Sequence, residues 1–298
     1  MVPPRDRLRF IRELRAFGER TLGLRFDGSF ARFVPRNPTA NWIYVVHPDR
    51  LKSALAGNET FRFSWKIAQV RRWDRYQRRR GRDTYVYRAE AHGGARCPVT
   101  PSLLAAPRAR QGYVVLHEAW HSTLRLEGVR LPYALEEATG RVVGVMGAVL
   151  FARTRGDREL LRETLTQARD WGALASFVNR TYRRLERAYR APGDRRDLLS
   201  RRRRHFRAIR EEARILRART ISAWEREELT RPMNNALFFR YYDYTRLYPL
   251  ALRVYRRVDS LPRAMRIFRR AGETGAPDAL RRFLRRGPGR SPQGMAVK

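Results

Sequence analysis

Apolar positions follow two different periods along the chain. Near the N-terminus, apolar side chains recur at three-residue steps between arginines: Leu8, Ile11, Leu14 and Phe17. This spacing predicts an amphipathic helix. Three later segments, 42–47, 61–70 and 84–89, are rich in β-branched and aromatic residues and are predicted strands. The first third of the chain therefore combines a helix with a small sheet.

From residue 111 onward the apolar spacing is helical. Two apolar helices are expected over 113–126 and 133–153, separated by a turn around Gly128. Before them, residues 98–107 read as a loop. More polar helices follow, over 157–189, 198–229, 236–257, 262–271 and 278–285. The last residues, 287–298, are rich in Gly, Pro and Ser and are predicted to be disordered.

Composition narrows the class of protein. The chain carries 65 Lys and Arg against 29 Asp and Glu, a formal net charge of +36. Its single cysteine, Cys97, excludes an intramolecular disulfide and any paired-cysteine zinc or redox site. No apolar run reaches the roughly 18 residues of a transmembrane helix, and no signal peptide is visible. We therefore expect no transmembrane segment and a cytoplasmic location.

One short motif indicates metal chemistry. Residues 113–124 read YVVLHEAWHSTL and contain His117-Glu118-x-x-His121. Residues four apart share one face of a helix, so two imidazoles at this spacing can bind one Zn²⁺. Glu118 projects beside them and can act as the general base that takes a proton from the attacking water.

The alternative is a buried helix with two hydrogen-bonded core histidines. Random placement of the five histidines and the glutamates would give about 0.005 such motifs, so the pattern favours metal. The apolar neighbours of the motif do not discriminate, because a zinc helix is buried as well. We interpret the motif as a site for one Zn²⁺ per chain.

A third ligand is required, and four residues are candidates. Glu127 has the metzincin spacing, but Leu124 replaces the glycine that would turn the helix toward the metal. Cys97 could ligate, although a lone cysteine is more often a small buried residue. Glu136 and Glu137 lie on the next apolar helix, where a carboxylate is costly unless it is paired or metal-bound.

Glu137 is the preferred ligand, and Glu136 stays an alternative. Gly140 follows Glu137 by three residues, and Gly140, Gly144 and Ala148 form a stripe of small residues at four-residue spacing. Such a stripe lets the second helix pack close to the zinc helix. The same stripe also serves ordinary helix packing, so the two interpretations are compatible.

Several segments resemble the bacterial "predicted aminopeptidase" family of zinc metallopeptidases. LHEAWHSTL followed by LEEATGRVVG is similar to the family's LHExxHxTLY and NESxAxxVG segments, and PMNNALFFRYY at 232–242 is similar to its P-L-N-N-A segment. The weaker matches are IYVVHPDRL at 43–51 and CPVTPSLLAAP at 97–107. The resemblance covers roughly residues 40–270, in consistent order.

The resemblance implies a gluzincin-type metalloprotease, a hydrolase of peptide or protein substrates that carries the family's aminopeptidase label, with Glu137 at the family's glutamate ligand. The apolar pattern favours one α+β fold that is mostly helical, and the resemblance implies a zincin-like core for it. We expect residues 232–244 to wall the cleft. Asn234, Asn235 and Arg240 would bind substrate, and Tyr242 would act on the oxyanion. Asn234 as a mere helix N-cap is the alternative.

The competing class is a non-catalytic, Arg-rich nucleic-acid-binding protein. Arginine runs at 78–80 and 201–204 could contact phosphates or another anionic surface non-specifically, yet no known nucleic-acid motif appears. For the metallopeptidase we expect a lead-in over 1–40 and one domain over 41–286. Within that domain we expect a sheet over 41–90, zinc helices over 111–153 and a helical subdomain over 157–286.

Overall fold

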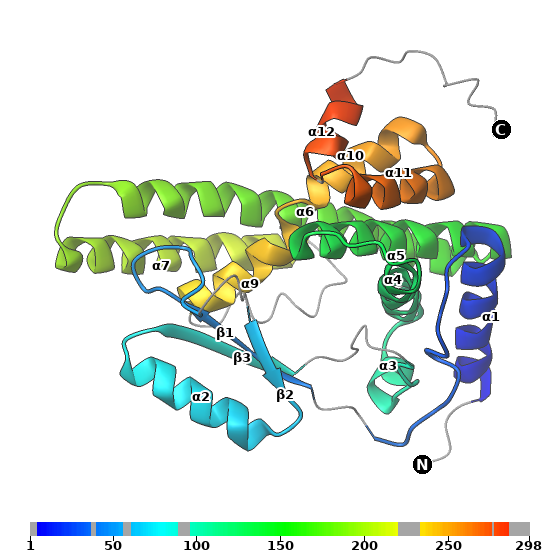
Figure 1. Cartoon of the computed structure of the whole chain (residues 1–298), viewed down its shortest axis with the longest axis horizontal. Helices are drawn as coiled ribbons and strands as arrows, with labels where there is room; N and C mark the ends of the chain where they lie inside the picture. Colours follow the sequence, from blue (N-terminus) through cyan, green and yellow to red (C-terminus); the bar gives the residue numbers. More distant parts are fainter. Residues whose placement is uncertain are drawn as a thin grey trace.

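The computed structural model describes residues 5–36, 40–55, 61–88, 96–219, 233–275 and 277–285. Helices dominate, and three strands form one small antiparallel sheet, as the predicted α+β class requires (Figure 1). The predicted tail at 287–298 lies outside the described residues. Within the described part, no helix combines the length and apolar character that crossing a bilayer demands.

The N-terminal helix α1 (Arg5–Leu22) is amphipathic, as its periodicity predicts. Ile11, Leu14 and Phe17 are buried on one face, with arginines on the other. Phe10 and Phe17 meet the ring of Phe151 edge-on, with ring centroids 5.7 and 5.3 Å apart. The helix therefore covers the long hydrophobic core rather than projecting from it.

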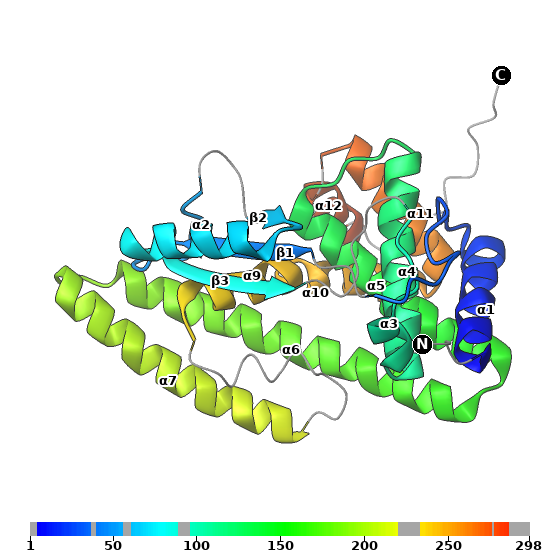
Figure 2. The same cartoon turned by 90° about the horizontal axis from the view of Figure 1, so that it is seen from below.

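The sheet has the strand order β2-β1-β3, with β1 (Asn41–Val46) between β2 (Phe61–Ser64) and β3 (Asp83–Arg88). Alternation gives it two faces. Ile43 and Val45 pack against Val70 of α2 (Ile67–Arg79). The opposite face is aromatic, and it packs against α9 (Asn235–Thr245), as Figure 2 shows. Its aromatic residues are Trp42, Tyr44, Phe61, Tyr85 and Tyr87.

The predicted strand at 61–70 is wrong in its second half. The strand ends at Ser64, whose hydroxyl accepts a hydrogen bond from the amide of Lys66 at 3.1 Å and turns the chain into α2. Ile67, Val70 and Trp73 then recur at a helical spacing and pack beneath the sheet. The aromatic and β-branched composition of this segment concealed the change of period.

Two further boundaries differ from the prediction. The expected loop at 98–107 contains the short helix α3 (Pro101–Ala105), capped by the side chain of Thr100, which accepts from the amide of Leu103. The expected helix at 236–257 is two helices, α9 and α10 (Tyr248–Val258). Pro249 lies in the first turn of α10 and has no amide for the carbonyl four residues earlier, which favours the break.

The helices α4 (Arg108–Leu126) and α5 (Tyr133–Arg155) form the centre of the molecule and run in opposite directions. The predicted small stripe lies between them. A methyl group added at Gly144 would be 2.7 Å from the Tyr113 carbonyl oxygen, and one at Gly140 would be 3.1 Å from the His117 ring. A side chain at Gly144 would collide with backbone, and one at Gly140 would press on the His117 ring, so the predicted close packing is confirmed.

The remaining helices surround this pair. The longest, α6 (Arg158–Arg190), packs along α5 and is followed by α7 (Arg195–Arg219), which lies antiparallel beside it (Figure 2). Three shorter helices complete the described chain: α10, α11 (Leu261–Glu273) and α12 (Asp278–Arg285). The predicted helix at 198–229 is confirmed as far as Arg219, and its remainder lies outside the described residues.

Candidate metal centre

The two histidines of α4 and one glutamate of α5 converge on a single point. The Nε2 atoms of His117 and His121 lie 3.1 Å apart. One carboxylate oxygen of Glu137 lies 3.5 Å from the His117 Nε2 atom, and the other lies 3.7 Å from the His121 Nε2 atom. In the described part of the chain, these three residues form the one group with metal-ligand spacing, and their ligand atoms all fall within 4.8 Å of one another.

These separations suit a tetrahedral zinc site. With zinc–ligand bonds of about 2.0–2.1 Å, two ligand atoms at a tetrahedral angle are roughly 3.3–3.4 Å apart. The observed distances of 3.1, 3.5 and 3.7 Å bracket that value. Three protein ligands also leave one position open, as catalytic rather than structural zinc sites do. The side chains present therefore fit the metal that the motif predicts.

Glu136 has a different place from its neighbour. Its Oε1 atom lies 2.7 Å from the Nδ1 atom of His121, on the side of the ring that faces away from the convergence point. A carboxylate that accepts from the outer ring nitrogen fixes the tautomer and raises the basicity of the inner nitrogen. The two adjacent glutamates thus lie in different places, with Glu137 at the convergence point and Glu136 against the outer nitrogen of His121.

The electrostatics of the cluster favour a cation. Burial alone would lower the pKa of His121, but the hydrogen bond that its ring donates to Glu136 and the charges of Glu137 and Glu118 outweigh it and raise that pKa to about 9. Burial would raise the pKa of Glu137, but the two histidines and Arg141 hold it at about 2. Three carboxylates thus surround two imidazoles in a buried space, which attracts positive charge.

Glu118 lies on α4 between the two histidines in sequence and close to them in space. Its charge contributes to the raised pKa of His121. Its Oε2 atom is buried and has no hydrogen-bond partner among the described residues. A carboxylate oxygen in this state is open to accept a proton, as a general base must be.

The other two candidate ligands lie elsewhere. Cys97 is buried in the hydrophobic core, where its amide donates to the Ser29 hydroxyl at 3.1 Å. Glu127 caps the end of α4 and pairs with Arg269 at 3.1 Å. Neither belongs to the group with metal-ligand spacing.

Two more residues of α5 flank the ligand. Tyr133 and Arg141 stand four residues before and after Glu137, on the same face of the helix. The guanidinium of Arg141 lies 3.8 Å from the centroid of the Trp171 ring and 5.5 Å from that of Tyr244. Its charge lowers the pKa of Glu137. Sequence reasoning passed over both residues, although the four-residue spacing was a usable signal.

Tyrosines from three elements gather beside Glu137. Burial raises the pKa of Tyr87, Tyr133 and Tyr244, and the charge of Glu137 raises each of them further. The hydroxyls of Tyr87 and Tyr244 lie 3.4 Å apart, and the Tyr133 and Tyr244 rings meet edge-on. These phenols therefore stay protonated and can donate hydrogen bonds next to the cluster.

Helix α9 and its N-cap carry the four residues expected to act from segment 232–244, whose first residue, Pro232, lies outside the described residues. The guanidinium of Arg240 lies 4.1 Å from the Tyr87 ring centroid and 5.8 Å from that of Tyr244. Tyr242 instead stacks on Tyr182 of α6, with ring centroids 3.5 Å apart. Arg240 thus lies against two rings of the tyrosine cluster, whereas Tyr242 stacks against α6.

Asn234 and Asn235 join α9 to the sheet. The Asn234 side chain accepts from the Leu237 amide at 2.9 Å, as an N-cap does, and donates to the Thr84 carbonyl. The Asn235 side chain accepts from the Tyr189 hydroxyl at 2.6 Å and donates to the His47 carbonyl at 2.8 Å. Their hydrogen-bonding groups are engaged within the fold, so these contacts position the helix.

Comparison with known proteins gives one family. The sequence model of the family described as "Putative aminopeptidase" matches residues 3–276, and the chain belongs to that family. No curated protein and no solved structure matches the chain. The family description supports peptidase activity, and the suspected resemblance is thereby confirmed.

Proposed function

We propose that this chain is a zinc-dependent metallopeptidase whose metal is held by His117, His121 and Glu137. The observation that carries the proposal is the convergence of their ligand atoms within 4.8 Å, beside Glu118. When bound there, zinc would supply a Lewis acid that polarises a peptide carbonyl and lowers the pKa of water toward ~7. The family description independently supports a peptidase.

The residues of the chain have separate tasks in this proposal. Glu118 takes a proton from the attacking water and delivers it to the leaving amine. Glu136 holds the His121 ring in one tautomer through its 2.7 Å contact with Nδ1. The hydroxyl of Tyr244 and the guanidinium of Arg141 are the candidate donors to the developing oxyanion, because both lie beside Glu137.

This assignment changes the tyrosine to be tested first. Tyr242 was the sequence-based choice, and it stacks on Tyr182. Tyr244 is electrostatically coupled to Glu137 and shares a hydrogen bond with Tyr87. Tyr244→Phe and Tyr242→Phe therefore form a matched pair that separates an oxyanion donor from a packing residue.

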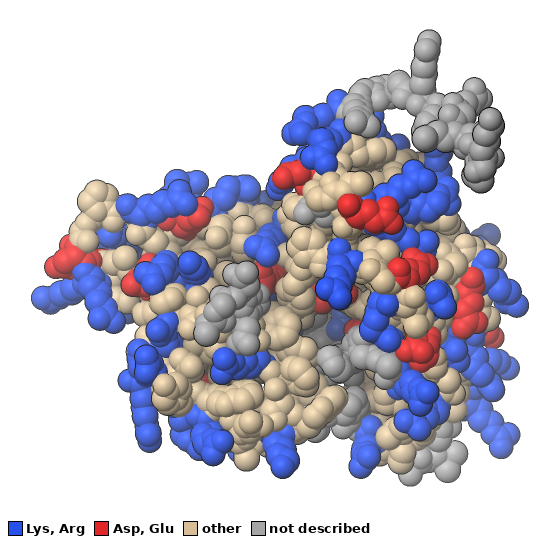
Figure 3. Space-filling model, viewed as in Figure 1, with Lys and Arg blue, Asp and Glu red and all other residues tan. Residues whose placement is uncertain are grey.

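Most of the described Lys and Arg residues lie on the surface, away from the buried cluster of His117, His121 and Glu137. Lys and Arg side chains are scattered over the face in Figure 3, with acidic groups between them and areas of other residues among them. This scatter does not form a single basic stripe on that face, which is what a nucleic-acid groove would require. The carboxylate-rich buried cluster is the more specific feature, and it favours the metallopeptidase over the nucleic-acid-binding alternative.

The test compares metal content and turnover in three proteins. Wild type should contain one zinc per chain by elemental analysis and hydrolyse peptide substrates. His121→Ala should lose the zinc. Glu118→Gln should keep the zinc and lose at least ~10²-fold in turnover. Full zinc loading of His121→Ala would refute the ligand set, and unchanged turnover in Glu118→Gln would remove that residue from the mechanism.

An exopeptidase can be distinguished from an endopeptidase by whether cleavage requires a free amino terminus on the substrate. We propose an aminopeptidase, on the family description. An aminoacyl-4-nitroanilide should then be cleaved, and its N-acetylated form should not. Cleavage of internal bonds in an N-acetylated peptide, with the zinc ligands intact, would assign an endopeptidase instead.

A further inference from the structure

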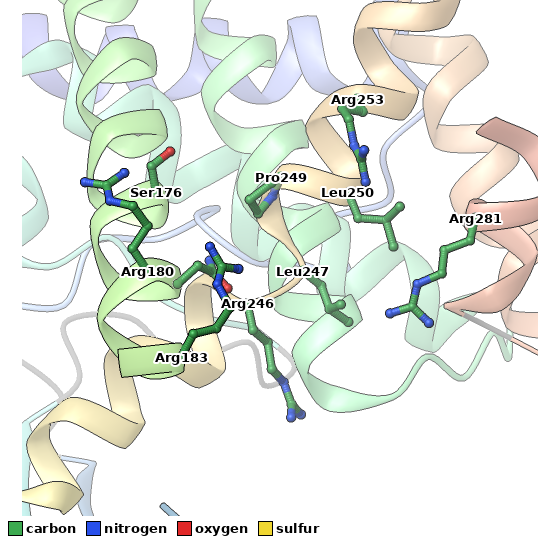
Figure 4. Close-up of a pocket in the computed structure, with 10 residues that line it drawn as sticks. Ser176, Arg180, Arg183, Arg246, Leu247, Pro249, Leu250, Arg253 and Arg281 are labelled. Carbon is green, nitrogen blue, oxygen red and sulfur yellow. The ribbon is translucent and has the colours of Figure 1, made fainter. Parts of the chain in front are cut away.

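A concave site away from the metal cluster lies between α6, α10 and α12. Its volume is about 500 Å³, within the usual range for small-molecule pockets. Five of its ten lining residues are arginines, and no lining residue is acidic: Arg180, Arg183, Arg246, Arg253 and Arg281. Figure 4 shows Arg180 and Arg183 on one side of the pocket and Arg281 on the opposite side. None of the lining residues belongs to the metal cluster.

These arginines come from four parts of the chain. Arg180 and Arg183 belong to α6, Arg253 to α10 and Arg281 to α12, while Arg246 follows α9. Adjacent arginines on one helix are common on a solvated surface. Convergence from separate elements is different, because tertiary packing must hold like charges together against their mutual repulsion.

The carboxylates near the pocket leave most of this charge unbalanced. Asp243 lies 3.5 Å from the Arg246 guanidinium, and Asp278 lies 2.6 Å from that of Arg281. Among the described residues, no hydrogen bond or ion pair is found for the side chains of Arg180, Arg183 or Arg253. Elsewhere on the helices, arginines pair with neighbouring acids, as Arg190 does with Glu186 at 3.0 Å.

One of the arginines is held in place from inside. Asp243, which accepts the contact from Arg246, is buried, with a side chain only 2% exposed. The Arg246 guanidinium also lies 5.9 Å from the centroid of the Tyr242 ring. A guanidinium anchored in this way loses little freedom when a ligand binds, which is the advantage of preorganisation. Leu247, Pro249 and Leu250 add apolar wall to the same pocket.

The charged wall continues along α6. A neighbouring cavity of about 330 Å³ shares Arg180 and Arg183 with the first and adds Arg184 and Arg187. Its lining does include an acid, Glu212, which lies 2.6 Å from Arg184. The second cavity is therefore partly neutralised, and the excess charge is concentrated in the first.

We propose that the pocket between α6, α10 and α12 binds a small anion that carries several phosphate groups. Arginine forks match phosphate oxygens two at a time, so five of them suit a ligand with many such oxygens. A triphosphate unit carries about four negative charges, close to the charge of the wall, whereas a single phosphate carries at most two. Inorganic polyphosphate and a nucleoside triphosphate share this chemistry.

The experiment titrates zinc-loaded full-length protein with tripolyphosphate by calorimetry. The test variant is Arg183→Gln with Arg253→Gln. The control is Arg75→Gln with Arg79→Gln on α2, which changes the net charge equally at exposed positions outside the pocket. We expect wild type and control to bind with dissociation constants within about twofold, and the test variant to bind at least about tenfold more weakly. Heat from zinc chelation would persist in the test variant, because its metal cluster is intact.

Titrations with other ligands distinguish inorganic polyphosphate from a nucleoside triphosphate. Equal affinity for ATP and tripolyphosphate would show that the pocket recognises the phosphate chain alone, and tighter binding of ATP would show that it recognises a nucleotide.

Three outcomes test the proposal itself. Binding of inorganic phosphate as tight as that of tripolyphosphate would overturn the proposal that the pocket needs several phosphate groups. Equally weakened tripolyphosphate binding in the test and control variants would overturn the assignment to this pocket, because it would show that the net charge attracts the ligand diffusely. Binding of a single-stranded oligonucleotide without tripolyphosphate binding would overturn the small-ligand proposal in favour of nucleic acid. If the double variant misfolds, Arg180→Gln alone gives the same comparison.

Discussion

The metal centre and the arginine pocket are charged in opposite ways and at different depths. The centre gathers Glu118, Glu136 and Glu137 around two histidines between α4 and α5. The pocket gathers five arginines and no acid at an open surface. A chain with a net charge of +36 thus has a cluster of negative charge between two buried helices.

The degree of burial determines how strongly the charges in each site interact. In the buried centre, few water molecules compete, and the carboxylates hold the pKa of His121 at about 9 against the effect of burial. At the pocket, water and dissolved ions screen the guanidiniums, so a ligand must offer several negative charges at once. The centre is thus suited to one small cation, and the pocket to a larger polyanion.

The largest expected effect distinguishes the two neighbouring glutamates. Glu137→Gln removes a carboxylate at ligand distance and should weaken zinc binding by at least about 10³-fold. Glu136→Gln removes only the partner of His121 Nδ1 and should weaken it by about 10–100-fold. Competition with a chelator of known affinity measures both. Equal losses in the two variants would show that both carboxylates bind the metal directly.

The next effect is the response of the centre to pH. His121 is protonated below about pH 9 and must lose that proton to bind a metal, so each bound zinc displaces one proton. Zinc affinity should therefore rise about tenfold per pH unit between about pH 6 and pH 8, and level off above about 9. The arginine pocket should not follow this course, because guanidinium groups keep their charge across the range. A flat profile for zinc would show that another group sets the charge of the centre.

Packing between α4 and α5 supplies a smaller effect. Gly144→Ala places a methyl group 2.7 Å from the Tyr113 carbonyl oxygen and should cost about 1–3 kcal/mol of unfolding free energy. Gly172→Ala on α6 meets nothing within 4 Å and should instead stabilise by about 0.4–1 kcal/mol. Urea unfolding of the two variants measures the difference. Equal behaviour would mean that α5 moves away from α4 at little cost.

The smallest expected effect is that of salt on ligand binding, and it should differ between the two sites. Raising NaCl from about 0.05 to about 0.5 M shortens the screening length to a few ångströms and should weaken tripolyphosphate binding by about tenfold. The zinc content should stay the same, because its buried ligands would bond the metal directly and salt screens buried charges far less than exposed ones. Loss of zinc over this range would show that screened charges, rather than direct ligand bonds, hold the metal.

The parts of the site that the sequence determined are the local ones. His117, Glu118 and His121 share one helix, so their common face follows from the helical period alone. The stripe of Gly140, Gly144 and Ala148 likewise predicted which face of α5 meets α4. The amphipathic helix α1 and most helix boundaries followed from the same periodicity.

Other features required the tertiary structure. Glu136 and Glu137 are adjacent in sequence, and only the packing of α5 on α4 places one at the convergence point and the other behind His121. The same holds for Tyr244 beside Glu137 and for the arginines of the pocket, which approach from separate elements. Helical periodicity fixes neighbours three or four residues apart, whereas these contacts depend on how distant helices dock, and docking is decided by side-chain fit across the whole core.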